Sequence, residues 1–197
     1  MATNIPLNTA PLVHVCWPEK EDYKWQRLAV LCVVGSFLLA VSAKIQVPFW
    51  PVPITMQTMV VLILGLTFGW RLGGLTYLLY LLEGALGLPV FAKGAGVAYI
   101  VGPTGGYLFG MFLACLIVGK LAEWGWDKKF FTTAAAMLLG NIIIYIPGLL
   151  WLGAVVGWSK PILDWGFFPF IYGDILKIVL ATLLIPSAWK FIDWVKK

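Results

Sequence analysis

The chain has 197 residues, of which 61% are hydrophobic and only 12% are charged. Soluble domains average about 45–50% apolar and about 25% charged residues, and the apolar residues here come in long runs, so a soluble fold is excluded. The net charge of +5 does not indicate nucleic-acid binding, because the basic residues lie between apolar runs and form no stripe on a polar surface.

The length accommodates about six membrane crossings at roughly 20 residues each, and little else. We therefore predict an all-α integral membrane protein with six transmembrane helices. Residues 1–25 are predicted to form a cytoplasmic or interfacial N-terminal arm, since they lack the basic start of a signal peptide. Residues 26–197 are predicted to form one membrane domain.

The six predicted spans are separated by breakers and polar residues. Three prolines in 47–53 exclude regular helix there, so this stretch is expected to be a loop or an extended re-entrant segment. Arg71 alone separates the second span from the third, and a Gly-rich connection over 93–106 follows the third. The spans are predicted over about 28–45, 54–70, 72–91, 107–122, 131–151 and 167–188.

The distribution of Lys and Arg predicts that both termini are cytoplasmic. With that topology the outer side receives three cations, Lys44, Lys93 and Lys160, and Lys177 falls inside the sixth span. Excess Lys and Arg on the cytoplasmic side is the pattern that membrane proteins follow. The cytoplasmic side receives ten: Lys20, Lys24, Arg27, Arg71, Lys120, Lys128, Lys129, Lys190, Lys196 and Lys197.

A strip of small residues follows one face of the first span, because its members are three or four residues apart. Such strips let two helices approach closely in lipid. The strip is either a docking face for another membrane protein or an internal packing face. Gly65-x-x-x-Gly69 and the Gly102 to Gly110 series are expected to report tight internal packing. The strip consists of Ala29, Cys32, Ser36, Ala40 and Ala43.

The sixth predicted span contains Asp174 and Lys177, three residues apart and therefore on one helical face. An ionisable residue in a span costs on the order of 2.5–3.5 kcal/mol on insertion scales. A buried ion pair seldom improves stability over apolar packing, so a ligand site is favoured over a structural pair that fixes helix register.

Other polar and aromatic residues are predicted near the same end, where the Pro-rich and Gly-rich loops would close over an outward-facing cavity. Non-helical backbone at membrane depth is tolerated where it lines such a cavity. An interhelical hydrogen bond explains any single polar residue equally well. The candidate binding residues are Asp174, Lys177, Asn141, Lys93, Gln57, Thr55, Tyr99 and Tyr107, with Thr58, Glu83, Trp50 and Phe91 nearby.

No motif predicts an enzyme, a metal site or a cofactor. The three cysteines lack metal-ligand spacing, and the single histidine, His14, lies in the polar N-terminal segment. Gly119-Lys120 does not end a phosphate-binding loop, because the surrounding residues are apolar and the flanking positions are wrong.

Four motifs in order resemble the biotin-transporter BioY family. They are Pro51-Val-Pro-Ile-Thr-Met-Gln57, Gly87-Leu-Pro-Val-Phe91, Gly102-Pro-Thr-Gly-Gly-Tyr107 and Tyr172-Gly-Asp-Ile-Leu-Lys177. The resemblance covers about residues 26–190. It implies the substrate-binding subunit (S component) of an energy-coupling factor transporter in a bacterial cell membrane. It also implies a membrane coupling protein (T component) and cytoplasmic ATPases as partners, with the small strip of the first helix docking on the coupling protein through Ala29, Ser36, Ala40 and Ala43.

The candidate residues suit biotin, which has a carboxylate, a ureido ring and apolar parts. Asp174 suits the ureido N–H groups. Lys177 either holds Asp174 in place or binds a ligand oxygen, and Lys93 is the alternative cation for the carboxylate. An S component for another small vitamin is the alternative function, and a small membrane enzyme is the alternative from a different class.

Overall fold

The computed structural model describes residues 11–18 and 21–195. Five helices in this part of the chain are long and apolar enough to cross a membrane. The elements are α1 (Leu12–Cys16), a 3-10 turn (Glu21–Tyr23), α2 (Lys24–Lys44), β1 (Gln46–Val47), β2 (Ile54–Thr55), α3 (Gln57–Ala85), α4 (Val97–Ile100), α5 (Gly105–Glu123), α6 (Phe130–Val156), α7 (Ile162–Gly166) and α8 (Phe168–Val195).

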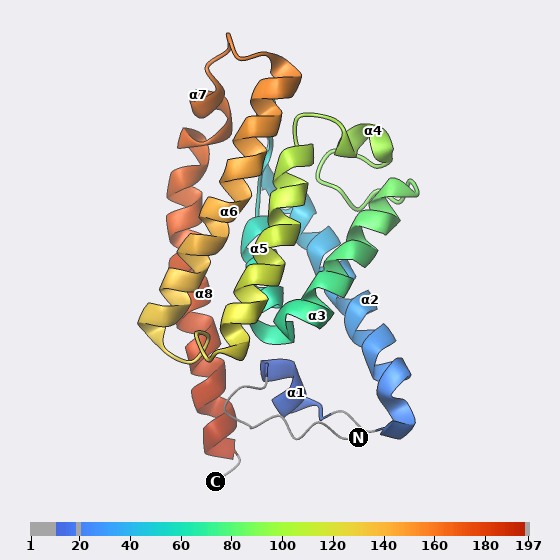
Figure 1. Ribbon diagram of the computed structural model, residues 1–197, viewed down its shortest axis with the longest axis vertical. Helices are drawn as coiled ribbons and strands as arrows, with labels where there is room; N and C mark the ends of the chain where they lie inside the picture. The colour runs from blue at the N-terminus through green and yellow to red at the C-terminus, as the bar shows by residue number, and fades with distance from the viewer. Residues whose placement is uncertain (1–10, 19–20, 196–197) are drawn as a thin grey trace.

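The long helices form an elongated bundle in which α5, α6 and α8 run roughly along the long axis (Figure 1). Helix α1 and the end of α8 lie at one end of the bundle, while α4, α7 and the loop before α3 lie toward the other. The residues predicted as an N-terminal arm fall partly outside the described part of the chain, and the described ones include α1.

Helix α3 contains the second and third predicted spans and is broken at Gly69. This glycine has φ 76° and ψ 174°, a conformation that side-chain-bearing residues rarely adopt. The two halves therefore fold back into a hairpin (Figure 1), and an added Cβ at Gly73 would lie 3.5 Å from Gly65 Cα. The break falls two residues before Arg71, the predicted boundary.

The third predicted span is too long, because the helix ends at Ala85 and not near residue 91. Gly87, with φ 99°, donates from its backbone N–H to the Gly84 carbonyl at 3.1 Å, a helix termination that needs a left-handed residue. The chain then folds back, and the Phe91 ring covers the Cα of Gly84.

The Pro-rich segment is not helical, as predicted, and it carries a short strand pair that an all-α fold does not include. β1 and β2 are antiparallel, with Gln46 opposite Thr55. Residues 48–53 connect them and lie close to the start of α3.

Glycines allow α5 to pack closely on both neighbours, and at Gly65 and Gly110 this confirms the tight packing that the two glycine series predicted. An added Cβ at Gly65 would lie 2.8 Å from the Cys115 carbonyl oxygen, and one at Gly119 would lie 2.5 Å from the Trp70 backbone nitrogen. On the other side, an added Cβ at Gly110 would lie 2.6 Å from the Ile144 carbonyl oxygen. Helix α5 is thus the centre of the bundle.

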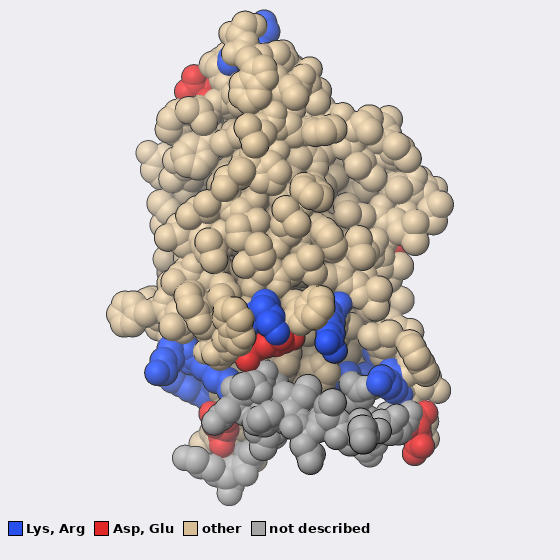
Figure 2. All heavy atoms as spheres, in the orientation of Figure 1, with Lys and Arg blue, Asp and Glu red and all other residues tan. Residues whose placement is uncertain are grey.

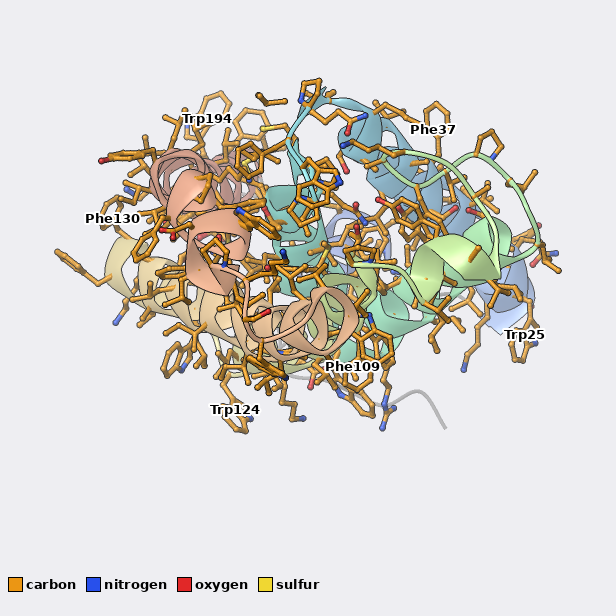
Figure 3. The ribbon with its side chains drawn as sticks, turned by 90° about the horizontal axis from the view of Figure 1, so that it is seen from above. Trp25, Phe37, Phe109, Trp124, Phe130 and Trp194 are labelled. Atoms are coloured by element: carbon orange, nitrogen blue, oxygen red, sulfur yellow. The ribbon has the colours of Figure 1, made fainter. Side chains whose placement is uncertain are left out.

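The surface of the bundle is apolar, as expected for a protein in lipid. Labelled aromatic side chains project outward around the bundle when it is viewed along its axis (Figure 3), and Phe37 on α2 is 65% exposed. Figure 2 shows Lys and Arg gathered at the end with α1, below a broad band that is almost free of charge. This distribution is typical of a multi-pass membrane protein.

Candidate functional site

The site begins with the ion pair on α8. Asp174 and Lys177 are each 6% exposed, and Lys177 Nζ lies 3.0 Å from Asp174 Oδ1. The same ammonium donates to Thr58 Oγ1 at 3.0 Å, so it also connects α8 to the start of α3. The pair faces the interior of the bundle and not lipid.

Helix α6 supplies two polar side chains one turn apart. Tyr145 donates its hydroxyl hydrogen to Asp174 Oδ2, so both oxygens of this carboxylate have a partner. Asn141 precedes Tyr145 by four residues and shares its helical face. Its Nδ2 donates to the Met137 carbonyl at 3.0 Å.

The start of α3 contributes an amide with unused hydrogen-bonding capacity. Gln57 is 3% exposed, and its Nε2 has no hydrogen-bond partner among the described residues. Its backbone N–H donates to Thr55 Oγ1 at 3.3 Å. Buried polar side-chain atoms nearly always have a partner, so an amide left open at a cavity is suited to a ligand.

These groups surround a small cavity of about 30 Å³, room for one or two water molecules. Small-molecule pockets usually measure about 300–1,000 Å³, so a guest of vitamin size requires the walls to move apart. The lining residues are Val52, Pro53, Thr55, Gln57, Thr58, Ala92, Tyr99, Thr104, Tyr107, Met111, Asn141, Ile144, Tyr145, Phe170 and Lys177.

Aromatic rings form much of the cavity wall. Tyr107 stacks on Phe170 with ring centroids 6.4 Å apart, and its hydroxyl donates to the Gly166 carbonyl at 2.8 Å. Tyr99 stacks on Phe91 at 5.0 Å. Stacked rings of this kind give a flat apolar surface with a polar edge.

Two loops lie over the cavity and are held to each other by side chains, an arrangement that we call the loop clasp. Lys44 Nζ donates to the Phe91 carbonyl at 2.5 Å, and Gln46 Nε2 donates to the Ala92 carbonyl at 2.9 Å. In the opposite direction, Lys93 Nζ donates to the Phe49 carbonyl at 2.8 Å.

The structure brings most of the candidate binding residues to one place. Asp174 pairs with Lys177 but does not itself line the cavity, and Lys93 is exposed in the loop clasp and is also outside the lining. Glu83 accepts a hydrogen bond from Ser36 at 3.0 Å and is also outside the lining. The candidates that line the cavity are Thr55, Gln57, Tyr99, Tyr107, Asn141 and Lys177.

Tyr145 and Phe170 are site residues that the sequence analysis missed. Tyr145 lies four residues after Asn141 and 29 before Asp174. Its spacing from Asn141 was the available signal, because residues four apart on a helix share a face.

Most of the small strip of α2 packs within the chain. Ser36 is 2% exposed and Ala43 is 0% exposed, while Ala40 is partly buried and Ala29 is exposed. The outward face of α2 carries larger apolar side chains such as Val33 and Phe37. A docking role for the strip stays a prediction, and an internal packing role is observed.

Comparisons with known proteins identify relatives of this chain. A probable biotin transporter BioY of Pyrococcus horikoshii is 40% identical over 148 residues, which cover 75% of this chain and 86% of the relative. The biotin transporter BioY of Thermotoga maritima is 39% identical over 152 residues, covering 77% and 89%.

The fold is also similar to a crystal structure of the S-component for biotin from an ECF-type ABC transporter. The TM-score is 0.74 at 22% sequence identity, and the match covers 87% of this chain and 95% of that chain. The family model described as "BioY family" matches residues 18–194. Because that match spans nearly the whole chain, the protein belongs to the BioY family.

Proposed function

We propose that the protein is a biotin-binding S component that takes up biotin across the cell membrane. The buried Asp174–Lys177 pair beside a cavity carries the proposal. Burying two charges in a membrane protein is costly, and here Lys177 lines the cavity while Asp174 lies 3.0 Å from its ammonium. The names of the relatives support the same ligand.

The chemistry of biotin matches the groups at this site. The ureido N–H groups need an acceptor, which Asp174 supplies because each carboxylate oxygen can accept a further hydrogen bond beside its present partner. The ureido oxygen needs donors, and Gln57 Nε2 has unused capacity. The apolar ring system and chain fit between Tyr99, Tyr107 and Phe170. Lys177 is the cation nearest to this set, and Lys93 is the alternative for the carboxylate if the loops rearrange.

The proposed topology has six crossings, with both termini in the cytoplasm and the cavity toward the outside. Each half of α3 counts as one crossing. Residues 57–68 span about 18 Å at 1.5 Å per residue, less than the roughly 30 Å hydrocarbon core, and the non-helical segment that ends in β2 precedes this half of α3. The basic end shown in Figure 2 supports a cytoplasmic position for that end.

The proposed partners are a membrane coupling protein and a pair of cytoplasmic ATPases. The fold similarity to an S-component supports this assembly. Uptake of labelled biotin in a host that lacks the coupling protein and the ATPases tests whether transport depends on them. Uptake that persists in this host would argue for transport without these partners.

Calorimetric titration of purified protein with biotin tests the site. Asp174→Asn and Lys177→Ala are each expected to weaken binding at least about tenfold, because a hydrogen bond to a charged group contributes about 1.5–3 kcal/mol. Lys160→Ala, an exposed cation in the loop before α7, is the control and should bind as wild type does.

The results of these titrations distinguish a wrong binding site from a wrong ligand. Unchanged affinity in both variants would remove the site assignment, and no binding to the wild type would remove biotin. A larger loss in Lys93→Ala than in Lys177→Ala would make Lys93 the partner of the carboxylate.

Two other functions remain to be compared. A competition panel of small vitamins identifies a different ligand if one displaces biotin readily. A membrane enzyme would need a nucleophile beside a base, and the described residues that line the cavity include no Ser, Cys or His.

A further inference from the structure

A second cavity lies at the opposite end of the molecule, where four helices meet. Its volume is about 750 Å³, far larger than the cavity beside Lys177. Its walls come from α1, the first turns of α2, the break in α3 and the last turn of α5. The lining residues are Pro11, His14, Lys24, Arg27, Leu28, Phe68, Trp70, Arg71, Leu72, Leu75, Lys120, Glu123 and Trp124.

The described lining is strongly basic, with four cations and one carboxylate. Glu123 Oε2 accepts from Lys120 Nζ at 2.8 Å, so the one carboxylate already has a partner. Arg71 is exposed, and among the described residues it forms no ion pair; its guanidinium carbon lies 5.1 Å from the centre of the Trp70 ring. This arginine retains the capacity to bind an anion.

One side of the same cavity is apolar. Phe68, Leu72 and Leu75 lie on both sides of the α3 break, and Leu75 is 45% exposed on the lipid-facing surface. Trp124 is 65% exposed and projects outward from the bundle (Figure 3). Tryptophan prefers the depth of lipid headgroups, so the cavity opens at the level where a headgroup meets its acyl chains.

Part of the wall is built by residues outside the matched family region. Pro11 and His14 precede residue 18, where the family match begins. Pro11 packs on the α3 break, since its Cγ lies 2.7 Å from a Cβ built at Gly69. Pro11 and helix α1 therefore close one side of the basic cavity.

We propose that this cavity binds the phosphodiester headgroup of an anionic phospholipid, with an acyl chain along the apolar wall. Basic pockets between helices on the cytoplasmic side are suited to such headgroups. The planar guanidinium of Arg71 donates two N–H groups to the phosphate oxygens. Leu75 contacts the chain.

Thermal unfolding of the full chain in neutral-detergent micelles tests the proposal. Added phosphatidylglycerol is expected to raise the apparent Tm, whereas equal amounts of phosphatidylcholine are not. Arg71→Gln should lower the apparent affinity for phosphatidylglycerol about tenfold, the loss expected for a charge-assisted contact, and Arg71→Lys should restore part of it. Circular dichroism and gel filtration verify that each variant is folded.

Lys190→Gln is the matched control, because it removes one exposed positive charge from α8 at the same end without touching the cavity. It should respond to phosphatidylglycerol as the wild type does. Equal responses to the two lipids, or equal losses in Arg71→Gln and Lys190→Gln, would overturn the proposal. An equal rise in Tm with inorganic phosphate alone would also overturn it, in favour of a simple anion site.

Discussion

Asp174 is oriented from two directions. Lys177 holds one carboxylate oxygen and Tyr145 holds the other, and these partners come from α8 and α6. Two fixed partners restrict the rotation of the carboxylate and leave it pre-organised as an acceptor. Thr58 fixes the ammonium of Lys177 in the same way, so four side chains from three helices act together.

Tyr145→Phe is expected to weaken biotin binding about tenfold, since it removes a hydrogen bond to a charged group worth about 1.5–3 kcal/mol. The ring and its packing on Phe167 remain. Calorimetry measures the change, and Tyr172→Phe is the control because that side chain is 84% exposed. Equal affinities for Tyr145→Phe and wild type would show that the tyrosine does not orient the acceptor.

Asp127, in the loop between α5 and α6, is predicted to make stability depend on pH. Its side chain is fully buried and accepts from Trp189 Nε1 at 2.6 Å, while its Oδ1 has no partner among the described residues. Burial raises the pKa of Asp127 to about 6, although the Trp189 hydrogen bond acts in the opposite direction.

The direction in which stability changes with pH follows from proton binding by Asp127. With its pKa higher in the folded state, Asp127 holds a proton that the unfolded chain releases, so stability falls as pH rises from about 4 to about 6 and then levels. Asp127→Asn should flatten this part of the curve while still accepting from Trp189. Apparent Tm values measured across that pH range check it, and an identical slope in the variant would contradict it.

Sequence patterns could predict residues whose spacing relates them on one helix. The Asp174–Lys177 pair was predicted because three residues apart means one face. Its contacts with Thr58 and Tyr145 join residues far apart in the chain, which no local spacing reveals. Lys93 was placed among the binding candidates for its charge, but its direction depends on how the loop after Gly87 folds.

At the scale of helices, the close approach of α3 and α5 depends on residues without side chains. Gly119 faces the backbone at the α3 break, and Gly65 faces the backbone at Cys115. The series that contains Gly65 predicted such packing, whereas Gly119 belonged to no predicted series. The break was predicted to within two residues because Arg71 interrupts the apolar run, but its exact place was not, since it depends on the left-handed conformation of Gly69.

Gly119→Ala is expected to destabilise the protein by about 1–3 kcal/mol, the usual cost of overpacking, because the new Cβ would lie 2.5 Å from a backbone nitrogen. Gly173→Ala is the control, since nothing lies within 4 Å of its added Cβ. That change should be neutral or slightly stabilising in helix α8. Denaturant or thermal unfolding in detergent compares the stabilities of the two variants. An equal loss of stability in both would refute the packing argument.

At the scale of the whole molecule, charge and hydropathy were enough to predict a multi-pass membrane protein, but not the residues at which its helices end. The predicted third span included residues 86–91 because they are apolar. In the structure Phe91 folds back over Gly84 and is buried, whereas Leu86 and Leu88 are exposed in the connection, so these apolar residues do not extend the helix.

The proposed topology predicts which cysteine a membrane-impermeant maleimide can reach. Cys16 is exposed, whereas Cys32 and Cys115 are buried. Cys16 should react only after cells are permeabilised. In a Cys16→Ser background, Lys160→Cys should react in intact cells, because Lys160 lies at the opposite end. The reverse labelling pattern would invert the topology.

The loop clasp and the apolar residues between the cavity and the basic end affect how easily ions could leak through the protein. Below Asn141, toward the basic end, Leu62, Val118 and Met137 are fully buried, and above it the loops are joined by three hydrogen bonds. Among the described residues, this apolar layer opposes the passage of protons and sodium ions, because a charge without polar partners is costly to bury. We therefore expect a host to carry many copies of this protein without dissipating the proton and sodium gradients across its membrane.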